Sequence, residues 1–115
     1  IRSLKLQKRA SENGFDWENP NDAFKKINEE KLELENALIQ KKDKEIEEEI
    51  GDLIFSIINL SRKLKIDPEN ALRKTNNKFL KRINYIERKL KKENKKFNET
   101  NLFELERLWN LAKKT

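Results

Sequence analysis

Four acidic residues form two pairs with the same spacing of three: Glu30 with Glu33, and Glu49 with Asp52. Residues three apart lie on one face of a helix, so the two carboxylates of each pair project together. The segments EEKLELENAL (29–38) and EEIGDLIFSI (48–57) place the acids at equivalent positions beside an apolar stripe. If these helices pack antiparallel, all four carboxylates converge, and their mutual repulsion calls for a neutralising cation.

The residue types restrict which cation fits. The chain has neither cysteine nor histidine, so a metal site must use oxygen ligands. Carboxylate oxygens suit Mg²⁺ or, alternatively, Mn²⁺, and Mg²⁺ in proteins usually bridges carboxylates to substrate phosphates. The alternative interpretation is two solvated acidic faces, the usual state of charged helical residues. The spacing alone leaves both open.

A second set of candidates could contact phosphate. Lys78 and Arg82 are four residues apart in KFLKR, and so are Trp109 and Lys113 near the end of the chain. Lysine and arginine are the side chains that bind phosphate oxygens. The alternative is a solvated basic face with Trp109 in the core. Asn59 lies in an apolar run, where its amide needs a structural partner or a ligand hydroxyl.

The elements that position these residues are predicted to be helices. Only two glycines and two prolines occur, and no segment alternates as a strand does. We predict an all-α antiparallel bundle of about five helices, at about 1–13, 20–40, 44–65, 68–94 and a last segment capped by Asn98 or Thr100. The run LIFSIINL, apolar nearly all round, predicts that the third helix is the buried one.

The length and composition indicate one domain over residues 1–115. No apolar run approaches a membrane span and no signal peptide is visible, so we expect no membrane partner. The absence of cysteine is compatible with a reducing cytoplasm, the predicted location. Because the chain lacks methionine and starts at Ile1, we expect it to be a domain of a longer protein.

The charge is unevenly distributed. Residues 1–60 carry 10 basic and 14 acidic side chains, whereas residues 61–115 carry 17 basic and 7 acidic ones. The basic half suggests an alternative function, a helical nucleic-acid-binding or assembly module without catalytic activity. That alternative predicts strongly salt-dependent binding and offers no reason for the matched acidic pairs.

The sequence resembles the MazG family of nucleoside triphosphate pyrophosphohydrolases. The signature E-x-x-E followed by E-x-x-D is present, with 15 residues between Glu33 and Glu49. Flanking blocks occur in the family order and cover almost the whole chain: LQKRASENGFDW, EEIGDLIFSIINLSRKL, DPENALRKTNNKFLKR and ELERLWNLAKK. The resemblance is greatest to the C-terminal domain of two-domain members.

The resemblance implies a helical homodimer that uses Mg²⁺ to hydrolyse nucleoside triphosphates to the monophosphate and pyrophosphate. It implies no stable complex with nucleic acid. The four acids would be metal ligands and catalytic residues, one of them accepting a proton from the attacking water. Substrate contacts would come from Lys78, Arg82, Trp109 and Lys113, with Asn59 and Trp17 as further candidates. A member that binds nucleotides without hydrolysing them, and one restricted to a single substrate, are the alternatives within the family.

Overall fold

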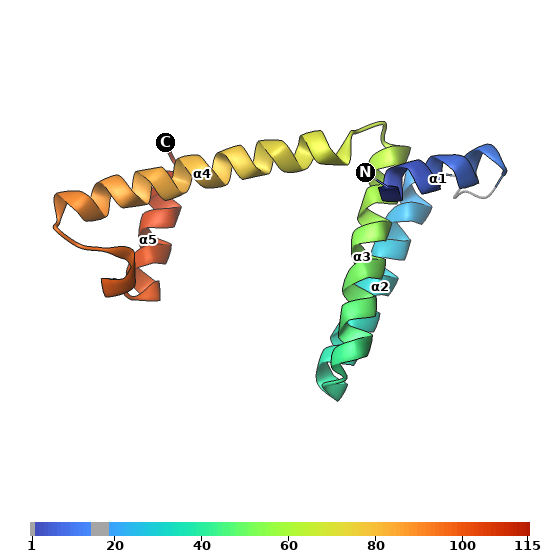
Figure 1. Ribbon diagram of the computed structural model, residues 1–115, viewed down its shortest axis with the longest axis horizontal. Coiled ribbons are helices and arrows are strands. Elements are labelled where there is room, and N and C mark those ends of the chain that lie inside the picture. The colour runs from blue at the N-terminus through green and yellow to red at the C-terminus, as the bar shows by residue number, and fades with distance from the viewer. Residues whose placement is uncertain (1, 15–18) are drawn as a thin grey trace. The chain divides into compact units, whose positions relative to one another are not determined.

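The computed structural model describes residues 2–14 and 19–115, and this part of the chain is all-α, as predicted (Figure 1). The helices are α1 (Arg2–Glu12), α2 (Pro20–Gln40), α3 (Asp43–Lys63), α4 (Pro68–Lys92), the short 3₁₀ helix η1 (Phe97–Glu99) and α5 (Leu102–Ala112). None of these helices is long and apolar enough to cross a membrane. The chain divides into two compact units, residues 1–70 and 71–115. A single domain over the whole chain stays a prediction.

Helices α2 and α3 form an antiparallel hairpin (Figure 1). The side chain of Asn19 accepts a hydrogen bond of 3.1 Å from the backbone N–H of Asp22, and Pro20 occupies the first turn, so α2 starts as predicted. Lys41 ends α2 in the left-handed conformation, with φ of 55°. The next helix starts at Asp43, and so short a turn leaves the two helices side by side.

Helix α1 completes the first unit by packing on α3. The buried side chain of Gln7 donates a hydrogen bond of 2.9 Å from Nε2 to the backbone carbonyl of Phe55. This bond links α1 to the middle of α3.

The prediction that α3 is a buried helix is wrong for this chain by itself. One face, with Ile58 and Asn59, is buried, but Ile54 and Ile57 are 54% and 46% exposed. Apolar residues all round a helix indicate that other residues bury it. The pattern does not distinguish burial within one chain from burial against a second chain.

The second unit contains α4 from residue 71 onward, η1 and α5, and the first residues of α4 belong to the first unit. Asp67 accepts a hydrogen bond of 3.0 Å from the N–H of Glu69 at the start of α4. The core contains Ile86, Leu90 and Leu108, with Tyr85, Phe97, Leu105 and Trp109 packed around it.

The predicted cap of the last helix was wrong. Asn101 caps α5, accepting from the N–H of Glu104 at 2.8 Å, whereas Asn98 lies in η1 and Thr100 ends it. Asn98, Thr100 and Asn101 are all residue types that cap helices, so the sequence did not distinguish them. Because the 3₁₀ helix η1 occupies residues 97–99, α5 begins only after Asn101.

Candidate active site

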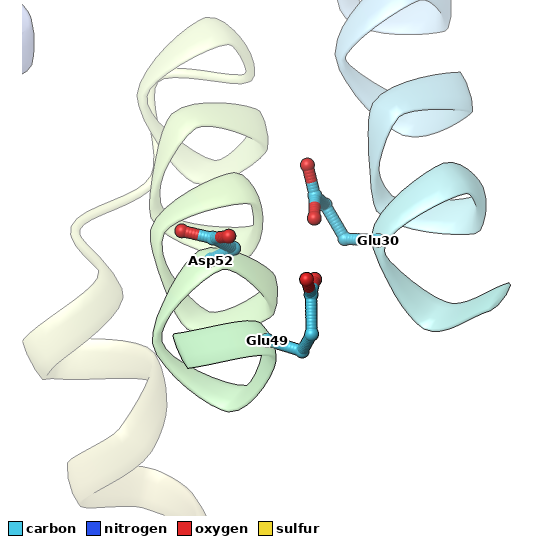
Figure 2. A group of neighbouring side chains, drawn as sticks. All are labelled: Glu30, Glu49 and Asp52. Carbon is cyan, nitrogen blue, oxygen red and sulfur yellow. The ribbon is translucent and has the colours of Figure 1, made fainter. Parts of the chain in front are cut away.

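Three of the four predicted acids meet between α2 and α3. Figure 2 shows Glu30 on α2 pointing toward Glu49 and Asp52 on α3. Each residue supplies one carboxylate oxygen, and these three oxygens lie within 4.8 Å of one another. The matched register inferred from the sequence therefore corresponds to an actual convergence of carboxylates across the hairpin.

Two buried oxygens in this cluster lack a hydrogen-bond donor within residues 2–14 and 19–115. Oε2 of Glu30 and Oε2 of Glu49 are buried and accept no hydrogen bond from the described residues. A buried carboxylate oxygen without a donor is destabilising, and a cation held between the acids would satisfy both oxygens. Oxygen-only ligands fit Mg²⁺ or Mn²⁺, so the residues present fit the predicted metal.

The electrostatics of Glu49 reflect the same crowding. Burial raises the pKa of this carboxyl to about 7, with further contributions from a hydrogen bond and like charge at Glu33 and from the charges of Asp52 and Glu30. Such a shift is typical of a carboxyl surrounded by other acids. The Glu49 carboxyl therefore releases its proton only near neutral pH.

Glu30 differs because a lysine neutralises it. Nζ of Lys26 lies 3.0 Å from Oε1 of Glu30, and this pairing lowers the pKa of the Glu30 carboxyl although the residue is only 5% exposed. The sequence analysis missed Lys26. Its position four residues before Glu30 was a usable signal, because side chains at i and i+4 on a helix are neighbours.

The fourth acid, Glu33, is near the cluster and is not among its three converging oxygens. Glu33 contributes to the pKa shifts of both Glu30 and Glu49, so its carboxyl lies close to theirs. The structure thus brings all four predicted acids to one place, with Glu33 at the side. Their roles as metal ligands stay predictions.

The predicted basic residues gather in the second unit. Lys78, Arg82 and Lys113 line one open cleft of about 770 Å³ between α4 and α5. Among the described residues, none that lines it is acidic, and the sequence analysis missed two of its cations, Lys81 and Arg88. The spacing of three between Lys78 and Lys81 was a signal for the first; Arg88 had none beyond lying on the same helix. This cleft has the charge that a phosphate chain requires.

The remaining candidates have different surroundings. Trp109 contacts Arg82, whose guanidinium carbon lies 5.1 Å from the centre of the indole. Asn59 is buried, and its Oδ1 accepts a hydrogen bond of 2.7 Å from Arg62, so a structural partner exists. Trp17 lies outside the described residues. Substrate binding by these residues stays a prediction.

Comparison with known protein families identifies the chain. The model of the MazG nucleotide pyrophosphohydrolase domain matches residues 18–86, a segment that contains all four acids and also Lys78 and Arg82. The chain belongs to the MazG family. The resemblance seen in the sequence is therefore confirmed.

Curated MazG relatives extend the similarity. The chain is 44% identical over 109 residues to the Thermotoga maritima protein named nucleoside triphosphate pyrophosphohydrolase/pyrophosphatase MazG, covering 95% of this chain and 42% of that protein. It is 32% identical over 118 residues to the Escherichia coli K12 nucleoside triphosphate pyrophosphohydrolase, covering 99% and 44%. It is also 43% identical over 67 residues to the Bacillus subtilis protein YabN, covering 58% and 14%. The chain spans less than half the length of these relatives.

Proposed function

We propose that this chain hydrolyses nucleoside triphosphates to the monophosphate and pyrophosphate with Mg²⁺ held by the acid cluster. The observation that carries the proposal is the convergence of Glu30, Glu49 and Asp52, with two buried oxygens that lack a donor, in a member of the MazG family. Two relatives are named for this activity. Mn²⁺ is the alternative ion, since the ligand chemistry is the same.

The chemistry follows from the residues. Glu30, Glu49 and Asp52 would hold the ion, with Glu33 beside them. A divalent ion at this position supplies neutralisation of the phosphate charge. One carboxylate of the cluster accepts the proton of the attacking water. Lys78, Arg82 and Lys113 bind phosphate oxygens and balance the negative charge of the leaving pyrophosphate.

We also propose that the working form is a homodimer. Ile50, Ile54 and Ile57 lie at i, i+4 and i+7 on α3, and all three are at least 44% exposed. An apolar stripe of this spacing is typical of a helix that packs on another. A second copy of the hairpin would cover it and bring α3 to the burial that its sequence predicts. The predicted cytoplasmic location remains part of this proposal.

The activity is tested by incubating the purified chain with each common NTP and dNTP and Mg²⁺, then separating the products by ion-exchange chromatography. We expect monophosphate and pyrophosphate. Glu49→Gln should lower the rate by more than about 100-fold, because replacing a metal ligand is more damaging than replacing an outer-shell partner. Glu48→Gln is the matched control, since Glu48 is the adjacent acid and is absent from the cluster.

Other products would point elsewhere. Diphosphate with inorganic phosphate would show that a different bond is cut. No turnover, together with binding of RNA or DNA that weakens steeply with salt, would favour the basic nucleic-acid-binding module instead.

A further inference from the structure

A second basic cavity belongs to the first unit. Its volume is about 390 Å³, and its lining comes from α1, from the end of α3 and from the turn that follows α3. Figure 1 shows α1 beside this end of α3, away from the turn that joins α2 to α3. The lining residues are Leu4, Lys8, Arg62, Lys65, Ile66 and Asp67.

Positive charge predominates in this cavity. Among the described residues that line it, Lys8, Arg62 and Lys65 are cationic and Asp67 is anionic. Oδ1 of Asp67 already accepts a hydrogen bond of 3.0 Å from the N–H of Glu69. Within residues 2–14 and 19–115, no ion pair involves Lys8 or Lys65. The end of a helix contributes about half a negative charge, so the lining stays net positive.

Arg62 is oriented by a neutral partner. Its Nη2 donates a hydrogen bond of 2.7 Å to Oδ1 of Asn59, whose side chain is buried. A carboxylate would orient the guanidinium equally well, but it would also neutralise its charge. Arg62 is itself half-buried, so it loses less conformational freedom on binding an anion than a fully exposed arginine would.

The turn after α3 holds the backbone of Lys65 in the left-handed region, with φ of 60°. The N–H groups of Lys65 and Ile66 donate to the carbonyls of Arg62 and Ser61, at 3.0 and 2.9 Å. These bonds satisfy the last carbonyls of α3, so the helix end does not need the cationic side chains as donors. Glycine is the usual residue at such a position, and the lysine adds a charge that the turn does not require.

We propose that this cavity binds the phosphate group of a small phosphorylated molecule, with Leu4 and Ile66 as its apolar wall. Lysine and arginine supply the donors that phosphate oxygens need. Arg62 lies ten residues beyond Asp52 on α3, about 15 Å along the helix axis, so this site is distinct from the acid cluster. The inference does not depend on the proposed hydrolysis.

The test is a titration of the ¹⁵N-labelled chain by two-dimensional NMR, in EDTA and at constant ionic strength. The probes are inorganic phosphate and AMP. We expect saturable shifts of the amide signals of Lys8, Lys65 and Ile66 with either probe. Tighter binding of AMP would assign the apolar wall to an organic group, and equal affinities would identify free phosphate as the ligand. Both results support a phosphate site.

Lys65→Gly separates binding from folding. Glycine adopts the left-handed conformation without strain, so this variant should be at least as stable as the wild type in urea. It removes one cation from the cavity, and we expect phosphate affinity at this site to fall by about 10-fold, as for a lost charge-assisted hydrogen bond. Lys8→Gln should have a similar effect from the other side of the cavity.

Lys5→Gln is the matched control. Lys5 is an exposed lysine on α1 that does not line the cavity, so its replacement lowers the net charge equally and should leave the affinity unchanged. Equal weakening by Lys5→Gln and Lys65→Gly would mean that net charge alone attracts the anion, and would overturn the inference. It would also fail if the amides of Lys8, Lys65 and Ile66 show no saturable shift, even where AMP shifts signals of α4 and α5.

Discussion

Glu30 and Glu49 face each other across the hairpin, yet their pKa values shift in opposite directions. Lys26 lowers the pKa of Glu30, while burial and three neighbouring acids raise that of Glu49 to about 7. The cluster therefore combines an ionised carboxylate with one that releases its proton near neutral pH. Only the ionised form of a carboxylate binds a metal well, so pH and cation should compete at Glu49.

The raised pKa of Glu49 predicts how pH affects stability. Below about pH 4.5 the carboxyl is protonated in both the folded and the unfolded chain. Between about pH 4.5 and about pH 7, only the folded chain keeps the proton on Glu49. The contribution of Glu49 to the free energy of unfolding therefore falls as the pH rises through this range. In EDTA, Glu49→Gln, which resembles the protonated acid, should gain stability relative to the wild type from pH 5 to pH 8.

This prediction is checked by urea unfolding of both proteins at several pH values. Above pH 7 and without Mg²⁺, the wild type should have the lower free energy of unfolding relative to Glu49→Gln. Saturating Mg²⁺ should remove this difference, because we expect the ion to bind only the folded protein. A difference between the two proteins that does not change with pH would contradict the raised pKa.

Lys26 is expected to support metal binding through Glu30. Its Nζ lies 3.0 Å from Oε1 of Glu30, which leaves the buried Oε2 for the ion. Lys26→Met removes the cation that keeps this nearly buried carboxyl ionised and oriented. We expect Mn²⁺ affinity, measured by electron paramagnetic resonance, to fall by about 10-fold, as for other outer-shell partners of metal ligands.

A lysine elsewhere on α2 provides the control. Lys31 and Glu35 form an exposed pair at 4.0 Å with the same spacing of four. Lys31→Met should leave Mn²⁺ affinity unchanged, since an exposed pair of this kind contributes little. Equal or tighter binding by Lys26→Met would mean that Lys26 mainly competes with the ion.

At the level of the elements, asparagine caps define where two of the helices begin. The side chains of Asn19 and Asn101 each accept a hydrogen bond from the backbone N–H three residues later. The first cap starts α2, which carries Glu30, and the second starts α5, which carries Trp109 and Lys113. Both acceptors satisfy backbone donors that a helix start otherwise leaves unpaired.

Removing the second cap should destabilise the protein. Asn101→Ala leaves the N–H of Glu104 without its acceptor, and we expect the free energy of unfolding to fall by about 1 kcal/mol. Chemical denaturation measures the change. Asn98→Ala is the control: this exposed side chain caps no α-helix, so its replacement should change stability by less than about 0.5 kcal/mol. If Asn98→Ala lowers the free energy of unfolding more than Asn101→Ala does, Asn101 is not the residue that caps α5.

At the level of the whole molecule, the isoleucine stripe on α3 predicts self-association. Ile54 is 54% exposed at the middle of the stripe. Ile54→Lys would place a charge in the apolar contact between two copies, where it would be desolvated. We expect the wild type to sediment as a dimer in analytical ultracentrifugation and Ile54→Lys to sediment as a monomer.

A lysine on another face of α3 tests whether position matters. Glu48→Lys lies about 120° around the helix from Ile54, at roughly 100° per residue, and should sediment like the wild type. A wild-type monomer, or dissociation by both substitutions, would argue against the stripe as the contact surface.

Much of the local structure could be predicted because its causes are local. The Asn19-Pro20 and Asp67-Pro68 starts, a short turn after Gln40 and the five α-helices depend on capping, proline and periodicity within a few residues. The turn is one residue shorter than the predicted 41–43, because α3 starts at Asp43. The convergence of the acids was also predictable. A short turn fixes the direction of the second helix, and the spacing of three fixes which side chains share a face.

Other features of the fold and the site arise from contacts between residues that are distant in sequence. The sequence by itself determined the helices, the two acidic pairs and the family. Only the tertiary structure decided that Asn101 is the cap, that α3 leaves isoleucines uncovered, and that Trp109 contacts Arg82. The reason is physical. Capping and periodicity act within one helix, whereas burial, pKa shifts and ring contacts arise from neighbours that are distant in sequence.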